Sequence, residues 1–211
     1  MNRVKRIVFT GGPSGGKTSI IELVQRRFGK KVATVPEAAT ILYQGGFPRK
    51  SGPEAMRHIQ RAIYYTVREL EDMVADLSGD RALSRGSADT TKVVGRPTAS
   101  VSLCDRGTLD GMAYWPEGGD DFLSSVESTL KKEFDRYAMV IHLKSPLSQS
   151  GYQTSSTRIE SHRQALELDK KTEQVWKGHP NRFVVSDEPD FLIKVNRVME
   201  MLDTEIPRLV G

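Results

Sequence analysis

The sequence predicts a three-layer α/β domain, in which a five-stranded parallel sheet carries helices on both faces. Short apolar runs alternate along the chain with longer stretches in which apolar residues recur every three or four positions. This alternation is typical of a parallel sheet flanked by helices. The length of 211 residues fits one domain, because domains usually hold about 100–200 residues. The sequence contains no internal repeat that would indicate a repeat architecture, and we expect a single domain over residues 1–211.

Each element follows from a local pattern. The strands are expected at five apolar runs, residues 3–9, 31–35, 100–104, 138–143 and 182–185. A glycine-rich turn after the first run leads into a helix over 17–28, and Pro36 suits the first turn of the next helix. Apolar residues three or four apart predict one long amphipathic helix over 53–77. The remaining helices are expected between 108 and 137, where they are short, and at 158–176 and 190–202.

Two polar segments interrupt this pattern. Residues 78–100 are rich in Gly, Ser and Thr. They predict an insertion loop, because more than about 15 residues without secondary structure usually form a lid or a disordered segment. Residues 145–163 follow the fourth strand and begin with a second polar stretch, which is expected to form a lid over a bound nucleotide.

Composition narrows the function classes. The 31 Lys and Arg exceed the 27 Asp and Glu by a net charge of +4, which suits an anionic small molecule and shows no polybasic tail. The single Cys104 cannot form an internal disulfide. The N-terminal apolar run is shorter than the ~7–15 residues of a signal peptide, and no run reaches the ~18 of a membrane span. We expect a cytoplasmic protein that binds no nucleic acid, with peripheral lipid contact possible.

A phosphate-binding loop follows the first strand. Residues 11–18 read Gly-Gly-Pro-Ser-Gly-Gly-Lys-Thr and match G-x-x-x-x-G-K-[ST] in full. A strand precedes the motif and a helix follows it, so successive backbone N–H groups can surround a phosphate. We expect Lys17 to contact the β- and γ-phosphates and the Thr18 hydroxyl to bind Mg²⁺. The predicted nucleotide-binding residues are Gly11, Gly12, Pro13, Ser14, Gly15, Gly16, Lys17, Thr18 and Ser19.

Charged residues also follow the second and third strands, at the sheet edge where ligands of open α/β sheets bind. Glu37 is a candidate general base, or a first-turn glutamate that complements the helix dipole. Asp105 is a candidate Mg²⁺ ligand or base, or an N-cap for the helix near Thr108. Arg106 is a candidate phosphate contact, or a surface charge whose ion pair contributes little. With the loop, these residues form the inventory that phosphoryl transfer requires.

Further candidates lie on two predicted helices. Arg158 and Arg163 follow the fourth strand and are candidate phosphate contacts, Arg158 as a catalytic residue and Arg163 as a nucleotide-binding one. They are five residues apart, about 140° around an ideal helix, and cannot both reach one phosphate from it. A solvated, charged helix is the alternative for both. On the long helix, Gln60 and Tyr64 either line an acceptor pocket or pack in the core.

Several of these elements together resemble a known family. They are the phosphate loop, the run Val35-Pro36-Glu37-Ala38-Ala39 and the run Asp105-Arg106-Gly107-Thr108-Leu109-Asp110-Gly111, with Arg158-Ile159-Glu160, Leu168-Asp169 and Trp176 further along. The chain resembles the AAA-labelled P-loop NTPase family that includes the ribosylnicotinamide kinase domain of the bacterial NAD regulator and the TRPL-translocation-defect proteins. The resemblance implies a nucleoside- or nucleotide-kinase-like fold with strand order 2-3-1-4-5. By similarity to deoxynucleoside kinases, it implies Glu37 as the base and Arg106 as a phosphate clamp.

Two main hypotheses of function follow. The first is a small-molecule kinase that uses ATP, with GTP also possible, and Mg²⁺ to phosphorylate a nucleoside- or nucleotide-like acceptor. The second is a regulatory protein in which a bound nucleotide orders a polar segment for a protein or phosphoinositide partner. Plain ATP hydrolysis, a third possibility, has no distinguishing feature here. A guanine-specific GTPase is disfavoured, because Thr91-Lys92-Val93-Val94 lacks the aspartate of an [NT]-K-x-D element.

Overall fold

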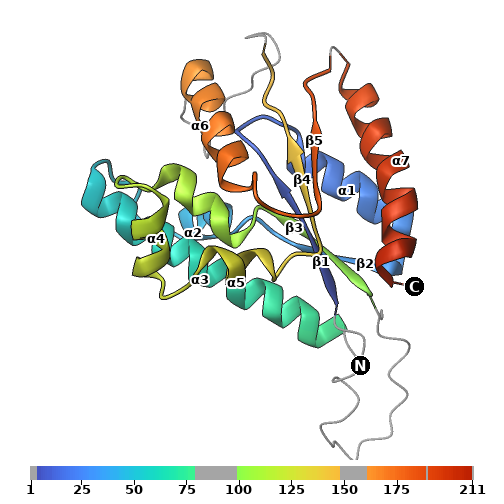
Figure 1. Cartoon of the computed structure of the whole chain (residues 1–211), viewed down its shortest axis with the longest axis horizontal. Coiled ribbons are helices and arrows are strands. Elements are labelled where there is room, and N and C mark those ends of the chain that lie inside the picture. The colour runs from blue at the N-terminus through green and yellow to red at the C-terminus, as the bar shows by residue number, and fades with distance from the viewer. Residues whose placement is uncertain (1–3, 79–98, 148–160, 189, 211) are drawn as a thin grey trace, which may run out of the picture.

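The computed structural model describes residues 4–78, 99–147, 161–188 and 190–210. Its elements (Figure 1) are β1 (Lys5–Thr10), α1 (Lys17–Phe28), the 3₁₀ helix η1 (Gly29–Lys31), β2 (Val32–Val35), α2 (Ala38–Gln44), α3 (Pro53–Ser78), β3 (Val101–Asp105), the 3₁₀ helix η3 (Thr108–Tyr114), α4 (Gly119–Ser125), α5 (Leu130–Phe134), β4 (Met139–Leu143), α6 (His162–Val175), β5 (Arg182–Val185) and α7 (Phe191–Val210). Most of the expected insertion at 78–100 and of the expected lid at 145–163 lies outside the described residues. Within the described ranges, no helix combines the length and the apolar character needed to cross a membrane.

The five strands form one parallel sheet in the order β2-β3-β1-β4-β5. This confirms the predicted fold class and the strand order that the family resemblance implies. The central strand β1 pairs Phe9 with Asp105 of β3 and Thr10 with His142 of β4. Because all strands are parallel, their carboxyl ends lie on one edge of the sheet. The segments that follow β1, β3 and β4 therefore meet at that edge.

Helices cover both faces of the sheet, with α1 and α7 on one side and α3, α4, α5 and α6 on the other (Figure 1). Ile7 of β1 belongs to the core beneath α1 and α7. Its neighbour Val8 belongs to the opposite core, with Tyr64 of α3 and the buried indole of Trp176. Successive side chains of a strand point to opposite faces. A strand that is buried on both faces is therefore a continuous apolar run, which explains why the strands were predictable.

The predicted elements differ from the observed ones mainly at their ends. The helix after β2 begins at Ala38, so Pro36 precedes it rather than occupying its first turn. α6 begins at His162 rather than near 158, because Ser161 and Gln164 form a reciprocal capping box that fixes the N-terminus of the helix there. α7 continues to Val210, past the expected end at 202. This extension buries Ile206 in the core beneath α1 and α7.

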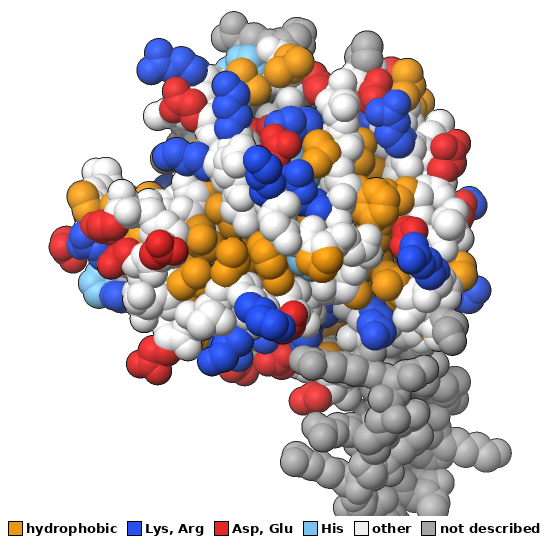
Figure 2. Space-filling model, viewed as in Figure 1, with side chains coloured by type: hydrophobic (Ala, Val, Ile, Leu, Met, Phe, Trp, Pro, Cys, Tyr) orange, Lys and Arg blue, Asp and Glu red, His pale blue; other side chains and the backbone are white. Residues whose placement is uncertain are grey.

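The surface and one part of the interior carry charges of both signs. On the face that Figure 2 shows, the described Lys and Arg side chains are interspersed with Asp and Glu and form no continuous basic stripe.

A cluster of charged residues also lies in the interior. Glu71 of α3 is fully buried beside two cations, with Arg6 Nε 3.5 Å and Arg136 Nη2 2.6 Å from its Oε2. Tyr137 Oη donates to Glu71 Oε1 at 2.6 Å. The same Tyr137 oxygen accepts from Thr108 N at 2.8 Å, so this cluster supports the segment after β3.

Removal of the buried Glu71 carboxylate should strongly destabilise the fold. We expect Glu71→Ala to lower the free energy of unfolding by about 3–5 kcal/mol, because the substitution removes the fully buried counter-ion that Arg6 and Arg136 share. The half-exposed Asp72, which also pairs with both arginines, would then be their common carboxylate. The matched control is Arg27→Ala, which breaks the exposed ion pair with Asp203 and should cost less than about 1 kcal/mol. Urea denaturation followed by circular dichroism measures both. Equal losses in the two variants would contradict the assignment of Glu71 as the electrostatic centre of this cluster.

Candidate functional site

The phosphate loop adopts a conformation that depends on left-handed backbone angles. Gly11 has φ 122°, Ser14 has φ 62° and Gly16 has φ 86°. Glycine adopts such angles without steric cost, whereas residues with a Cβ rarely do. α1 begins directly afterwards at Lys17, so the loop and the first turn of the helix expose their N–H groups together. This is the geometry in which a helix N-terminus binds an anion.

Lys17 is folded against the loop. Its ammonium donates to the carbonyl oxygens of Gly11 at 3.2 Å and Gly12 at 2.7 Å, and its side chain is buried. Burial and the nearby charge of Arg106 lower the pKa of Lys17 to about 8. The ammonium therefore carries a charge that water screens poorly, and phosphate oxygens would stabilise it.

Thr18 and Asp105 form a pair that fits a divalent cation. Thr18 Oγ1 donates to Asp105 Oδ2 at 2.5 Å. The other carboxylate oxygen, Asp105 Oδ1, is buried and has no hydrogen-bond partner among the described residues. Burial and the negative charge of Glu37 raise the pKa of Asp105, which is the electrostatic condition that a bound cation would relieve. A hydroxyl and a carboxylate are the hard oxygen ligands that Mg²⁺ prefers.

The described residues hold no group of three His, Cys, Asp or Glu side chains arranged for a metal ion. Mg²⁺ usually takes one or two protein ligands and completes its shell with phosphates and water. The Thr18–Asp105 pair therefore suits a cation that arrives with a nucleotide. Asp105 ends β3 and Gly107 precedes η3 without a side-chain cap, so Asp105 does not cap the following helix.

Glu37 and Arg106 meet at the carboxyl ends of β2 and β3. Arg106 Nε donates to Glu37 Oε1 at 2.7 Å, and Thr40 Oγ1 donates to Glu37 Oε2 at 2.5 Å. Burial by itself would raise the pKa of Glu37, but Arg106 and Thr40 outweigh it and lower the pKa to about 2. The Glu37 side chain makes no capping bond to α2. Its carboxylate is therefore ionised and pairs with Arg106 instead of capping α2.

Arg106 is itself fixed by a residue that sequence reasoning did not select. Its Nη1 donates to Gly11 O at 3.2 Å and to Asp110 Oδ2 at 3.3 Å. Asp110 is buried and also accepts from Thr10 Oγ1 and Trp176 Nε1, each at 2.7 Å. The signal was present, because Asp110 lies four residues after Arg106 in the Asp-Arg-Gly-x-x-Asp-Gly element. Asp110 thus links the phosphate loop, Arg106 and α6.

A cavity of about 820 Å³ joins these groups. One end is lined by residues 13–18 of the phosphate loop and by Glu37, Asp105 and Arg106. The cavity then extends between α2, α3 and η3, where its lining includes Tyr43, Met56, Gln60, Ile63, Val67 and Tyr114. Gln60 lines this cavity, whereas Tyr64 packs edge-on against Phe122 in the core. Helical spacing alone could not tell whether Gln60 and Tyr64 line a pocket or pack in the core, and the structure assigns Gln60 to the pocket and Tyr64 to the core.

The other predicted residues lie away from this cavity or outside the described chain. Ser19 is exposed in the first turn of α1 and is not among the cavity-lining residues. Arg163 is 90% exposed and pairs with Glu167 one turn along α6, so the structure does not bring it to the loop. Arg158 lies outside the described residues. Gln164, the neighbour of Arg163, is the α6 residue that lines the cavity.

The sheet order, the phosphate loop and the Thr18–Asp105 pair define a P-loop NTPase of nucleotide-kinase-like fold. A family model described as an AAA domain matches residues 6–191, and the chain belongs to this AAA domain family. No curated protein sequence matches the chain.

Solved structures of similar fold include kinases. Thymidylate kinase from Candida albicans has a TM-score of 0.64 at 12% identity, over 96% of this chain and 92% of that chain. Thymidylate kinase from Ehrlichia chaffeensis has a TM-score of 0.56 at 12% identity, over 96% and 100%. Deoxyadenosine kinase from M. mycoides, with the products dCMP and dCDP bound, has a TM-score of 0.53 at 14% identity, over 94% and 99%. At these identities the likeness establishes the shared fold.

The lowered pKa of Lys17 predicts that nucleotide affinity depends on pH. Below about pH 8 the Lys17 ammonium of the free protein is charged, and phosphate binding needs no proton. Above that pH the free side chain is neutral and must take up a proton to bind, so affinity should fall by up to about tenfold per pH unit. Isothermal titration calorimetry with MgATP from about pH 7 to about pH 9.5 measures this fall. The Lys17→Met variant should bind weakly at every pH, and a constant affinity of the unsubstituted chain would contradict the prediction.

Proposed function

We propose that this protein is a P-loop kinase that transfers the γ-phosphoryl group of ATP to a hydroxyl or phosphate of a small nucleoside- or nucleotide-like acceptor. One observation carries the proposal. The phosphate loop and a cavity of a size suited to a small molecule meet at Glu37 and Arg106, so a phosphoryl donor and an acceptor can be held on either side of these two residues. A protein that only hydrolyses nucleotide has no need of such a second compartment.

The donor end would be held by the loop and α1. The N–H groups of the loop and the Lys17 ammonium neutralise the phosphate oxygens. Thr18 and Asp105 would hold Mg²⁺, which would supply positive charge to offset that of the phosphate oxygens. The buried Asp105 Oδ1, which has no partner within the described part of the chain, supports this assignment, since a buried carboxylate oxygen without a partner is costly unless a ligand satisfies it.

Glu37 and Arg106 act at the junction between donor and acceptor. The Glu37 carboxylate is ionised at neutral pH and can accept a hydrogen bond from an acceptor hydroxyl, which orients its oxygen toward the γ-phosphorus. Arg106 Nε and Nη1 are used by Glu37, Gly11 and Asp110. The guanidinium lines the cavity, and its fixed orientation suits the equatorial oxygens of the migrating phosphoryl group. Such preorganised charge is the main source of catalysis in phosphoryl transfer.

The far end of the cavity has the character of an acceptor pocket. Met56 and Ile63 of α3 supply apolar walls, Tyr43 and Tyr114 supply aromatic rings, and Gln60 supplies an amide. Ligand pockets typically combine apolar and aromatic walls with a few polar groups that fix orientation. A planar heterocycle with amide-like edges, such as a nucleobase, matches this combination.

A transfer screen tests the function directly. The full chain, Mg²⁺ and γ-labelled ATP or GTP are incubated with pooled nucleosides, nucleotides and ribosylnicotinamide, and labelled products are separated by chromatography. We expect a labelled product that is absent with the Lys17→Ala variant, which removes the charge nearest the β- and γ-phosphates. Tight nucleotide binding without transfer to any acceptor would contradict the kinase and favour a regulatory nucleotide-binding role.

Substitution of Glu37 tests its role at the junction. Glu37→Gln should lower kcat by about 10²-fold or more, because the neutral amide orients an acceptor hydroxyl less strongly than the carboxylate and no longer balances the charge of Arg106. The dissociation constant for MgATP should stay within about threefold, since Glu37 lies on the acceptor side of the loop. The control is Glu117→Gln, which removes a carboxylate paired with Arg57 outside the cavity and should leave kcat unchanged. An unaltered kcat in Glu37→Gln would rule out the proposed role.

A further inference from the structure

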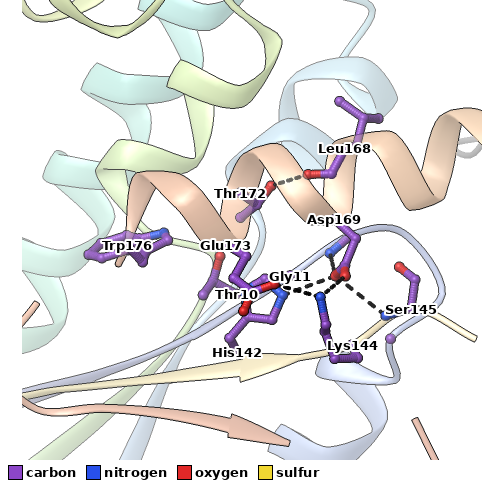
Figure 3. A network of polar contacts seen from close by, with 12 residues as sticks. Thr10, Gly11, His142, Lys144, Ser145, Leu168, Asp169, Thr172, Glu173 and Trp176 are labelled. Atoms are coloured by element: carbon purple, nitrogen blue, oxygen red, sulfur yellow. Dashed lines mark hydrogen bonds and ion pairs between the residues drawn. The ribbon is translucent and has the colours of Figure 1, made fainter. Parts of the chain in front are cut away.

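A single carboxylate on α6 contacts the phosphate loop on the side opposite the cavity. Asp169 is buried, and Figure 3 shows its carboxylate pointing from α6 toward the loop and the end of β4. Asp169 Oδ1 accepts from Gly12 N at 2.9 Å, from His142 Nε2 at 3.0 Å and from Ser145 N at 3.4 Å. Asp169 Oδ2 accepts from Lys144 Nζ at 2.8 Å. One side chain thus joins the phosphate loop, β4 and the segment that leaves β4.

The contact between α6 and the loop is close as well as polar. A Cβ on Gly12 would lie 2.4 Å from Ser145 Oγ, 2.7 Å from Asp169 Cβ and 2.9 Å from Ala165 O. Ser145 Oγ also donates to Pro13 O at 2.7 Å. The backbone of residues 12–13 is therefore packed closely between α6 and the segment after β4.

Hydrogen-bond donors keep the Asp169 carboxylate ionised. Burial alone would raise the pKa of Asp169, but the hydrogen bonds from His142, Lys144 and Gly12 lower it well below its usual range. His142 is fully buried, and its Nδ1 has no partner among the described residues, so the hydrogen bond of its Nε2 to Asp169 orients the ring. The carboxylate is thus a fixed acceptor at every pH near neutrality.

Asp169 acts on the side of the loop that faces away from the ligand. The cavity is lined by residues 13–18, whereas Gly12, His142, Lys144 and Asp169 are not among its lining residues. The same helix presents Gln164 to the cavity. Asp169 therefore lies outside the cavity, and its hydrogen bonds within the described residues reach the phosphate loop only through the backbone at Gly12.

We propose that Asp169 is a positioning residue, which sets the phosphate loop in its binding conformation by holding the Gly12 N–H and so ties α6 to the loop. This inference rests on the proposed nucleotide binding at the loop. Its physical basis is that a displacement of about 1 Å in groups that hold a ligand costs on the order of 10²-fold in function. Without an acceptor at this point, the Gly12 N–H is buried and unsatisfied, and the loop must move to relieve it.

The experiment compares three variants of the full chain by calorimetric titration with MgATP. Asp169→Leu keeps the volume and removes the acceptor, and we expect at least tenfold weaker binding. Asp169→Asn combined with Lys144→Met keeps one acceptor oxygen for Gly12 and removes the ammonium that would face the new amide donor. This double variant should bind within about threefold of the unsubstituted chain. Glu173→Gln is the control, since Glu173 also pairs with Lys144 at 2.6 Å but does not contact the loop, and it should bind within twofold.

Thermal unfolding of each variant separates loss of fold from loss of affinity, because a purely structural role would lower the melting temperature without weakening MgATP binding at a temperature where the variant is folded. Asp169→Leu binding within twofold would overturn the proposal, as would an equal loss in Glu173→Gln. If Asp169→Leu does not fold, the double variant decides, and binding more than tenfold weaker in its folded state overturns the proposal. Intact MgATP binding without transfer in the unsubstituted chain would contradict the proposed kinase but leave this comparison valid.

Discussion

The close approach of the phosphate loop to the end of β4 is the constraint on which the rest of the site depends. A Cβ on Gly11 would lie 2.2 Å from Leu143 O, and one on Gly15 would lie 2.7 Å from the same oxygen. Only glycine permits this distance, so the loop rests directly on the strand. Lys194 of α7 strengthens the contact by donating to Lys144 O at 2.8 Å. Because the loop is seated on the sheet, the segments after β2 and β3 can reach it, and the ligand groups meet at one point.

Around the phosphate loop, buried charged side chains form ion pairs, and a few of their atoms remain available to a ligand. Glu37 and Arg106 neutralise each other, and Asp110 adds a second carboxylate to the same guanidinium. Among the residues that the structure describes, Lys17 donates hydrogen bonds to backbone carbonyls alone, and one buried oxygen of Asp105 has no partner. A cation bound with a triphosphate would satisfy both, since it offers positive charge to Asp105 and negative charge to Lys17. The electrostatics of the site are thus complementary to a metal–nucleotide complex.

The phosphate loop lies between two sides of the molecule, and each side contacts it in a different way. On the cavity side, α2, α3 and η3 enclose the space that we propose for an acceptor. On the far side, α6 and the end of β4 contact Gly12 and Pro13 through Asp169 and Ser145. Trp176, at the end of α6, reaches Asp110 and so links the two sides. The loop is therefore held by packing and hydrogen bonds from both directions, which is how a polar, glycine-rich segment can remain ordered.

The sheet, the phosphate loop and the convergence of Glu37, Asp105 and Arg106 follow from the amino-acid sequence alone. Buried parallel strands are continuous apolar runs, the loop motif is contiguous, and the carboxyl ends of parallel strands share an edge. The strand order came from the family resemblance, because local patterns do not encode which strands are neighbours. The folded chain was needed to show that Asp110 and Asp169 support the phosphate loop and the end of β1, that Gln60 rather than Tyr64 faces the cavity, and that Arg163 points to solvent. The partners of Asp110 and Asp169 include residues on the phosphate loop or the preceding strand 100 or more positions away, and such pairings follow from packing between elements, which no local pattern in the chain records.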